Sequence, residues 1–378
     1  MHDVYVNVNP NPSGMRMNPL EHQIHYPFGE ALPGEGQALE VAPGVKWLRM
    51  GLPFALGHIN LWLLRDRQPD AATGIPRDGW TVVDCCIDSA ATRAQWEQVF
   101  SNALEGLPIL RVLVTHMHPD HIGLAHWLCE RWQVRLWISA TDYNAARIGV
   151  YDRVGFGGEA SADFYALHGM QDAAFLQHVR ARTSYYPTLV PALPTHFRRL
   201  MDGDGIDIGG RVWLCIAGYG HAPEHMALYS AELSLLISGD MVLPRISTNV
   251  SVHASEPEAD PLRLFLDSLP RYVELPADTL VLPSHGKPFT GLHERIRQLQ
   301  DHHAERLGEI LEAASQRHLS AAAVLPILFK RPLDTHQLTF AMGEALAHLH
   351  LLWLGGQLVR AKDSGGGFVF YRADAERP

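Results

Sequence analysis

A cluster of ligand-type side chains lies in residues 115–121, which read Thr-His-Met-His-Pro-Asp-His. The apolar run before this cluster is typical of a strand, and the residues after it are typical of a helix. Alternate side chains of an extended segment point the same way, so His116 and His118 can bind one cation from one face. Asp120 and His121 follow at the turn and can reach a second cation. The spacing predicts a metal centre, and the alternative is an exposed loop that is rich in histidine by chance.

Three more ligand-type residues lie beside predicted strands. They are His225 in Gly-His-Ala-Pro-Glu-His, Asp240 in Ser-Gly-Asp and His285 in Ser-His-Gly. With the first cluster they provide enough side chains for two coordination shells. Imidazole and carboxylate ligands suit zinc, although iron or manganese can occupy the same kind of site. We therefore expect two zinc ions per chain, with iron or manganese as the alternative.

The order of these motifs, HxHxDH, GHxPxH, SGD and SHG, resembles that of the metallo-β-lactamase superfamily over about residues 45–290. The resemblance implies a division of the ligands between two metals. The first metal takes His116, His118 and His225, the second takes Asp120, His121 and His285, and Asp240 bridges both. The implied fold is of the α/β class, an αββα sandwich with a helical insertion and a C-terminal winged-helix-like module.

The expected chemistry is hydrolysis. Two cations about 3.5–4 Å apart can share a hydroxide and lower the pKa of the parent water toward about 7. Such a hydroxide is a nucleophile at neutral pH, and one metal also polarises the oxygen of the group under attack. Asp120 can in addition orient the hydroxide or accept its proton, which makes it the expected catalytic residue.

Three residues near the motifs are expected to act without binding metal. Asp84, in Asp-Cys-Cys, stands where the family usually has an Asp-Thr-Gly turn, and its carboxylate is expected to fix a ligand imidazole. His221 resembles the family's non-ligand histidine, and its alternative is an incidental place in the loop. Glu224 replaces the usual glycine and is either a specificity residue at the mouth of the site or a harmless variation.

Four further residues are candidates for substrate contact. His58, Asn60 and Lys287 are polar and lie near predicted strand ends or metal loops. Tyr185 belongs to the aromatic residues of segment 140–200, which can line an acyl or aryl pocket over the metals. The alternatives are a polar group satisfied by solvent or backbone, and an aromatic ring packed against the sheet.

The elements that must hold these residues follow from the hydrophobic pattern. Alternation of apolar runs and helical stretches predicts a sheet covered by helices. Strands are expected at 45–52, 59–65, 80–87, 110–115, 134–139, 210–217, 225–230 and 233–238, and helices at 91–104 and 121–132. The prediction places the ligand motifs in the loops at the ends of these strands.

The chain divides into three parts by composition. Residues 1–40 are rich in proline, glycine and asparagine and are expected to form an extended arm. By the resemblance, residues 41–291 are expected to form the metallo-β-lactamase domain, with the helical insertion at about 140–200. Residues 292–378 carry helices and a hairpin and are expected to form the winged-helix-like module.

Composition limits the partners. No apolar run approaches the roughly 20 residues of a membrane span, and residues 1–21 lack the apolar stretch of a signal peptide, so a cytoplasmic location without membrane contact is expected. The four cysteines lie in or beside apolar segments, which favours buried reduced thiols. A net charge of −10 argues against nucleic acid, as do eight Lys and Arg against nine Asp and Glu in residues 300–378.

The expected substrate is a small molecule with a thioester, carboxylic ester or lactone. The main alternative is an endoribonuclease or phosphodiesterase, because a similar tail occurs in one β-lactamase-like endoribonuclease. A β-lactamase and an iron-dependent persulfide dioxygenase are further alternatives on the same fold. A non-catalytic binding protein is the alternative outside enzymes. A homodimer through the helical tail or the arm is also considered, because an amphipathic helix must bury its apolar stripe somewhere.

Overall fold

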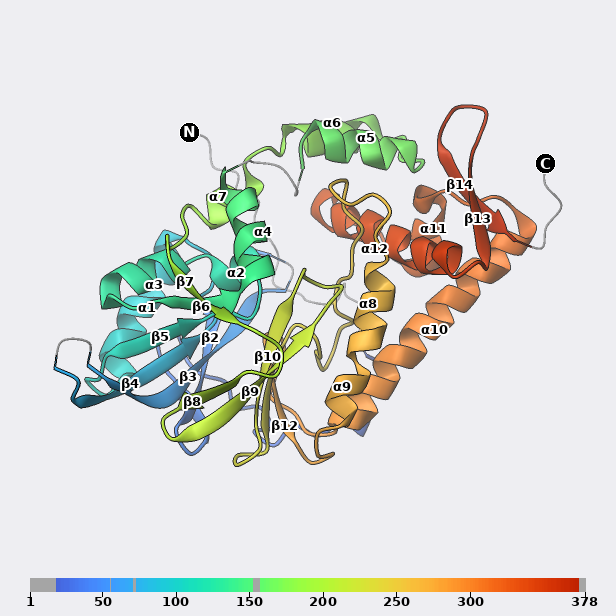
Figure 1. Ribbon diagram of the computed structural model, residues 1–378. Coiled ribbons are helices and arrows are strands. Elements are labelled where there is room, and N and C mark those ends of the chain that lie inside the picture. The colour runs from blue at the N-terminus through green and yellow to red at the C-terminus, as the bar shows by residue number, and fades with distance from the viewer. Residues whose placement is uncertain (1–17, 55, 71–72, 152–156, 374–378) are drawn as a thin grey trace.

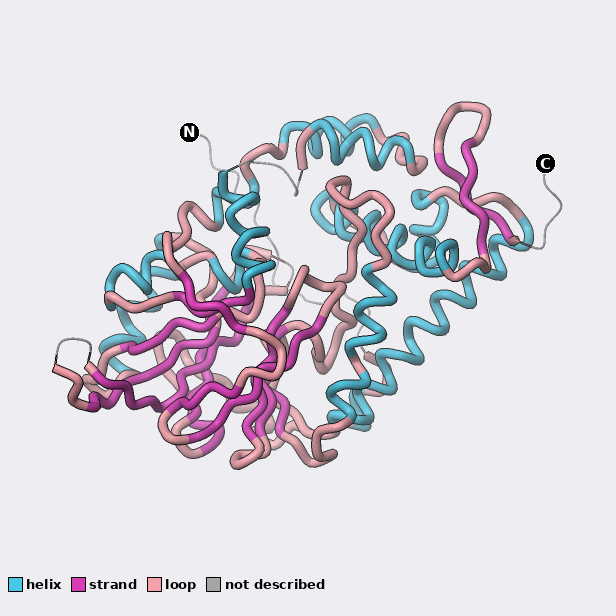
Figure 2. Tube along the Cα trace, viewed as in Figure 1, coloured by secondary structure: helices cyan, strands magenta, loops and turns pink. Residues whose placement is uncertain are grey.

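Two sheets packed face to face form the centre of the protein, and helices cover both outer faces (Figures 1 and 2). The computed structural model describes residues 18–54, 56–70, 73–151 and 157–373. The predicted arm therefore lies outside the described residues up to position 17. Its described part contains the short helix η1 (Glu21–Gln23) and packs on the domain, where His25 pairs with Thr290. The predicted αββα sandwich is confirmed.

The first sheet has seven strands in the order in which they follow along the chain. Its strands are β1 (Leu39–Ala42), β2 (Val45–Gly51), β3 (His58–Pro69), β4 (Pro76–Val83), β5 (Ile109–Leu113), β6 (Leu136–Ser139) and β7 (Phe197–Leu200). Strands β1 to β4 are antiparallel and β4 to β7 are parallel. Strand β7 lies in the segment expected to be helical, so the prediction missed this edge strand.

The second sheet has five strands in the order β12-β11-β10-β9-β8. Their bounds are β8 (Gly205–Ile208), β9 (Arg211–Gly218), β10 (His225–Ser230), β11 (Leu235–Gly239) and β12 (Leu280–Pro283). Both faces of the long strand β3 are apolar, because Trp62 and Leu64 pack between the sheets while Leu61 and Leu63 pack under the outer helices. Burial on both faces explains the continuous apolar run in this strand.

Helices on the outer face of the first sheet pack against its apolar side chains. They are α1 (Ala90–Asn102), α2 (Pro119–Ile122), α3 (Ala125–Trp132), α4 (Ala140–Tyr151) and α7 (Tyr185–Leu189). The single helix expected at 121–132 is divided in two. At the break, the Leu124 amide donates to the Cys86 carbonyl. Gly123 packs closely on Ile87, because a Cβ added to Gly123 would lie 2.6 Å from the Cα of Ile87.

The remaining helices cover the second sheet and continue into the C-terminal region. They are α5 (Glu159–Leu167), α6 (Ala173–Ala181), α8 (Pro261–Ser268), α9 (Pro270–Val273), α10 (Leu292–Gln316), α11 (Ala321–Leu328) and α12 (Thr335–Leu354). Strands β13 (Leu358–Lys362) and β14 (Phe368–Arg372) form the predicted hairpin. Helices α5 and α6 lie over the C-terminal helices, where the Tyr165 hydroxyl donates to the Thr339 carbonyl (Figure 1). The winged-helix likeness of this region stays a prediction.

Two of the composition arguments concern features of the fold. All four cysteines are buried and free. Within the described ranges, the helices include none with both the length and the apolar character that crossing a bilayer requires.

Candidate metal centre

The candidate ligands lie at the edge where strand ends of the two sheets meet. Backbone hydrogen bonds join the loops there, because the Met226 amide donates to the Thr115 carbonyl and the Ser284 amide donates to that of Gly239. The Asn60 amide in turn donates to Ser284 at 2.7 Å. Residues distant in sequence are therefore held at one place by main-chain contacts, which fixes the side chains that follow each strand.

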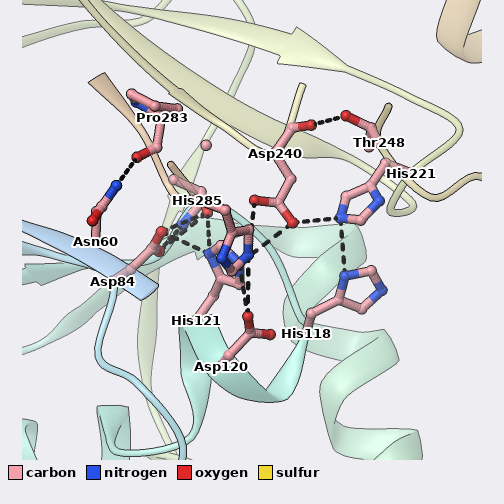
Figure 3. Close-up of polar contacts among 12 residues, drawn as sticks. Asn60, Asp84, His118, Asp120, His121, His221, Asp240, Thr248, Pro283 and His285 are labelled. Atoms are coloured by element: carbon pink, nitrogen blue, oxygen red, sulfur yellow. Dashed lines mark hydrogen bonds and ion pairs between the residues drawn. The ribbon is translucent and has the colours of Figure 1, made fainter. Parts of the chain in front are cut away.

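A first group of ligand atoms comes from His116, His118, His221 and Asp240. The His118 Nδ1 lies 2.9 Å from His116 Nε2 and 3.0 Å from His221 Nε2. The His221 Nε2 lies 3.2 Å from an Asp240 carboxylate oxygen, as Figure 3 shows. Three imidazole nitrogens and one carboxylate oxygen thus face a common point.

A second group comes from Asp120, His121 and His285. The His285 Nε2 lies 3.4 Å from Asp120 Oδ2, and His121 Nε2 lies 3.7 Å from the same oxygen. Asp240 stands between the groups, because its Oδ1 is 3.5 Å from His285 Nε2 and its Oδ2 is 3.7 Å from His121 Nε2 (Figure 3). Its carboxylate can therefore reach a cation in either group.

Several polar atoms of this cluster fit a metal ion. The His121 Nε2, His285 Nε2 and Asp240 Oδ1 atoms are buried and have no hydrogen-bond partner among the described residues, a costly arrangement unless another group occupies the space. Two ligands about 2.1 Å from one tetrahedral metal lie roughly 3.4 Å apart, which matches the separations in the second group. The donor set, made of imidazole and carboxylate, suits a divalent cation.

The far nitrogen of each of three cluster histidines is held by an oxygen. His121 Nδ1 lies 2.8 Å from the Asp84 carboxylate, and His221 Nδ1 lies 2.7 Å from the Asn249 carbonyl. His285 Nδ1 lies 2.8 Å from the His58 carbonyl. A carbonyl oxygen can only accept, so Nδ1 carries the proton in the last two rings and leaves Nε2 as a lone-pair donor for a metal.

Asp84 occupies the supporting position expected from the sequence. It follows strand β4 with a φ of 63°, and its carboxylate accepts from the Thr115 amide at 2.8 Å as well as from His121. The Thr115 hydroxyl also lies 3.0 Å from His116 Nδ1. A single carboxylate and its neighbour Thr115 therefore orient one imidazole of each group.

The two histidines of the GHxPxH motif exchange the places expected for them. His221 lies in the first group, whereas His225 begins strand β10 and its Nε2 accepts a hydrogen bond from the Asp240 amide at 3.2 Å. The His225 ring packs on Gly239, where a Cβ would lie 2.0 Å from Nε2. We therefore propose His221 as the ligand and His225 as its support, because His225 Nε2 already accepts from the Asp240 amide.

Electrostatics differ between the groups. Burial lowers the pKa of His116 and His118 well below the usual value, and the neighbouring imidazoles add to this effect. Burial would raise the pKa of Asp120, but His121 and His285 outweigh it and hold that pKa below its usual value. His116 and His118 are thus neutral donors, whereas the second group contains an ionised carboxylate of its own.

The structure gives Asn60 and His58 a different task from substrate contact. The fully buried Asn60 amide group donates to the carbonyls of Pro283 and Gly286 and accepts from Trp47 Nε1. Burial lowers the pKa of His58 to about 3, and its neutral Nε2 accepts from the Gly286 amide at 2.9 Å. We reassign both residues to support of the loop that carries His285.

Lys287 and Glu224 also point elsewhere. The Lys287 Nζ lies 2.9 Å from both the Gly29 carbonyl and the Glu30 carboxylate, so it ties the described part of the arm to the domain. Glu224 accepts from the Thr141 hydroxyl at 2.7 Å, at the start of α4. The substrate contacts expected for both residues stay predictions. Tyr185 begins helix α7, and the next residue, Tyr186, donates its hydroxyl to the Met117 carbonyl between two candidate ligands.

Two supporting residues were missed by the sequence reasoning. The buried Asp142 carboxylate accepts from the Met117 amide at 2.8 Å and from the Glu224 amide at 2.6 Å, which joins two metal loops. Its position two residues into helix α4 was only a weak indication of this supporting role. Asn249 acts through its backbone carbonyl on His221, and a backbone contact leaves no signal in residue type.

Comparison with known families identifies the chain. The profile of the metallo-beta-lactamase superfamily matches residues 74–285. The chain belongs to this superfamily. A second profile, that of the metallo-beta-lactamase-like C-terminal domain, matches residues 307–373. The sequence resemblance to the superfamily is therefore confirmed, and the C-terminal region is one that other superfamily members share.

Individual superfamily members support the same conclusion. A β-lactamase domain protein from Burkholderia ambifaria is 54% identical, with a TM-score of 0.87 over 94% of this chain and 99% of that one. A metallo-beta-lactamase family protein from Thermus thermophilus is 28% identical, with a TM-score of 0.70 over 88% and 100%. The probable metallo-hydrolase YqjP of Bacillus subtilis (strain 168) is 24% identical over 81% of this chain and 91% of its own length. The chain is thus a hydrolase of the metallo-β-lactamase fold, a fold that implies binding of divalent metal, and it has a His and Asp cluster that could hold such an ion.

Proposed function

We propose that the protein is a dinuclear zinc hydrolase that cleaves a thioester, carboxylic ester or lactone in a small molecule. The observation that carries this proposal is the pair of adjoining ligand groups with Asp240 between them. Two cations held there would lower the pKa of a shared water and polarise the carbonyl oxygen of the substrate. A cytoplasmic location and a homodimer stay predictions.

The protein's own residues have separable roles in this proposal. Asp240 would hold both groups in register, since its two oxygens face different imidazoles. Asp84 would orient His121 through its Nδ1, so that Nε2 is the ring nitrogen that faces the metal. Asp120, ionised at neutral pH, would accept a proton at its carboxylate from the attacking water.

Metal content and substrate class can be tested together. Protein purified without chelator should contain about two zinc ions per chain by elemental analysis, and it should hydrolyse one ester class in a panel of thioesters, lactones and aryl esters. A cephalosporin and a short RNA in the same panel cover β-lactam and phosphodiester cleavage. Asp120→Ala should abolish turnover and lower metal content toward one ion. Iron with oxygen consumption and no hydrolysis would contradict the proposal.

A further inference from the structure

An arginine that pairs with no described carboxylate lies against helix α7, the helix that contacts the Met117 loop of the metal centre. Arg182 follows helix α6 and is half-buried, and its guanidinium lies 3.7 Å from the centre of the Tyr185 ring. Its Nη1 donates to the Thr339 hydroxyl at 3.3 Å. Burial lowers its pKa, which shows that its charge is held partly away from water.

The contrast with Arg180, two residues earlier, shows what is unusual. Arg180 lies on α6 itself and pairs with the carboxylates of Glu159 and Asp163 at 3.1 and 2.8 Å. An exposed arginine therefore has two acidic partners, while the more buried Arg182 has a hydroxyl and an aromatic face. Burying a charge without an opposite charge is unfavourable, and the described residues give Arg182 none, so an anion supplied from outside would stabilise this arrangement.

The surroundings of Arg182 connect it to the metal loops on two sides. On one side Tyr185 begins α7, and the next residue, Tyr186, donates its hydroxyl to the Met117 carbonyl between two ligand histidines. On the other side His336 of α12 lies 6.0 Å from Tyr185 and stacks on Phe54 at 5.7 Å, measured between ring centroids. Phe54 belongs to the loop that leads to His58 and so to the His285 loop.

Each member of this aromatic cluster, Phe54, Tyr185 and His336, is only partly buried, as is Arg182. A brace inside the core would be closed to solvent, whereas these side chains are within reach of a ligand. The cluster therefore joins three elements, the β2–β3 loop, α7 and α12, and the first two of these connect to loops that carry candidate ligands. A substrate whose reacting carbonyl lies at the metal ligands would extend its other end toward these residues.

We propose that Arg182 and the aromatic cluster form a subsite that binds an oxyanion group, a carboxylate or phosphate, at the far end of the ester substrate. The planar guanidinium matches the geometry of both anions, and the rings can contact the apolar carbons between anion and ester. This inference rests on the proposed esterase function. It narrows the substrate class from any ester to esters that carry a negative charge.

The test compares two esters of equal length, mono-4-nitrophenyl glutarate and 4-nitrophenyl pentanoate, on the metal-loaded full chain. Arg182→Met should lower the ratio of their kcat/KM values about 10- to 100-fold, mainly through KM for the anionic ester. A partly unfolded sample lowers both rates equally, so the ratio isolates the subsite. Arg182→Lys keeps the charge without the planar fork and should give an intermediate ratio.

Arg180→Met is the matched control and should leave the ratio within about twofold. An unchanged ratio in Arg182→Met would show that Arg182 is only a structural brace. Calorimetric titration with glutarate and with glycerol 3-phosphate gives a readout independent of turnover and tells the two oxyanions apart. If neither ester is hydrolysed, the esterase proposal fails, and weaker binding of either anion by Arg182→Met would still support the subsite. Equal binding of both anions by wild type and Arg182→Met would overturn it.

Discussion

The two ligand groups at the strand ends depend on different parts of the chain. The second group is supported from the first sheet, because Asp84 holds His121 and the His58 carbonyl holds His285. In the first group, His221 is held by the carbonyl of Asn249, whose loop docks on helix α12. One group therefore relies on the sheet edge, and the other also relies on the C-terminal region.

The contacts between this loop and α12 are specific. The Val252 amide donates to the Gly343 carbonyl at 3.1 Å, and the Asn249 side chain donates to Glu344 at 3.4 Å. A Cβ at Gly343 would lie 2.6 Å from the Ser251 side chain. Because the two ligand groups are held by different parts of the chain, we expect that a substitution can weaken metal binding by one group and not by the other.

The largest effect is expected from substitution of Asp240, which lies between the two ligand groups. Asp240→Ala removes the carboxylate that faces both, so kcat/KM should fall by more than about 100-fold, the upper end for loss of a merely supporting residue. Elemental analysis should find the metal content reduced in both groups. Retention of two tightly bound ions would contradict the placement of Asp240 between them.

His221→Ala and His225→Ala form the next pair. His221→Ala removes a ligand and should leave about one zinc per chain even with metal in excess. His225→Ala removes a support of Asp240 and should lower metal affinity about 10- to 100-fold while keeping two sites. Metal titration distinguishes the variants, and the reverse pattern would restore His225 as the ligand.

Asp84→Asn sharpens the contrast at the second group. The amide can no longer accept equally from Thr115 and His121, so the orientation of the His121 ring should weaken. The affinity of one metal should fall about 10- to 100-fold, with a smaller loss at the other, because Asp84 reaches His116 only through the Thr115 hydroxyl. Competition with a chelator measures the two affinities, and equal losses at both sites would argue against separate support.

Glu344→Gln should have the smallest effect and acts on the support of the first group. Burial raises the pKa of Glu344 to about 7. The pKa of Glu344 is higher in the folded protein than in the unfolded chain. The contribution of Glu344 to the free energy of unfolding is therefore fully present below about pH 4.5 and is lost as the pH rises through 7. The variant should therefore be more stable than wild type at pH 8.5, by roughly 1–3 kcal/mol, with the gap closing at acidic pH.

Denaturant unfolding at several pH values measures this difference in the free energy of unfolding between Glu344→Gln and wild type. Glu312→Gln, on the exposed face of α10, is the matched control and should show no pH-dependent difference. A gap of equal size at pH 5 and pH 8.5 would exclude ionisation of Glu344 as its cause.

Much of the central sandwich could be predicted from local sequence. Strand β10 at His225–Ser230 was expected with the bounds it has, because its apolar run ends at clear turn signals. Strand β4 was expected to continue to residue 87 but ends at Val83. Asp84 and Cys86 have positive φ values there, and the apolar Cys85-Cys86-Ile87 run is buried without being a strand.

The site was predictable where type and spacing decide, and not where distant contacts decide. Residues 116–121 carry their chemistry in one short segment, so the first cluster could be found. Asn60 and His58 look like exposed polar residues until the loop at 283–286 is placed against them. The choice between His221 and His225 depends on which ring packs on Gly239, a contact that spacing alone does not reveal.

The docking of the Asn249 loop on α12 sets an order of events during synthesis. Every candidate ligand is synthesised before residue 286. The helix that seats the loop behind His221, α12, is synthesised about 50 residues later. At 5–20 residues per second this is a delay of several seconds. The support of His221 thus depends on a helix that is synthesised after every candidate ligand, whereas Asp84 and His58, which support the second group, are synthesised before it.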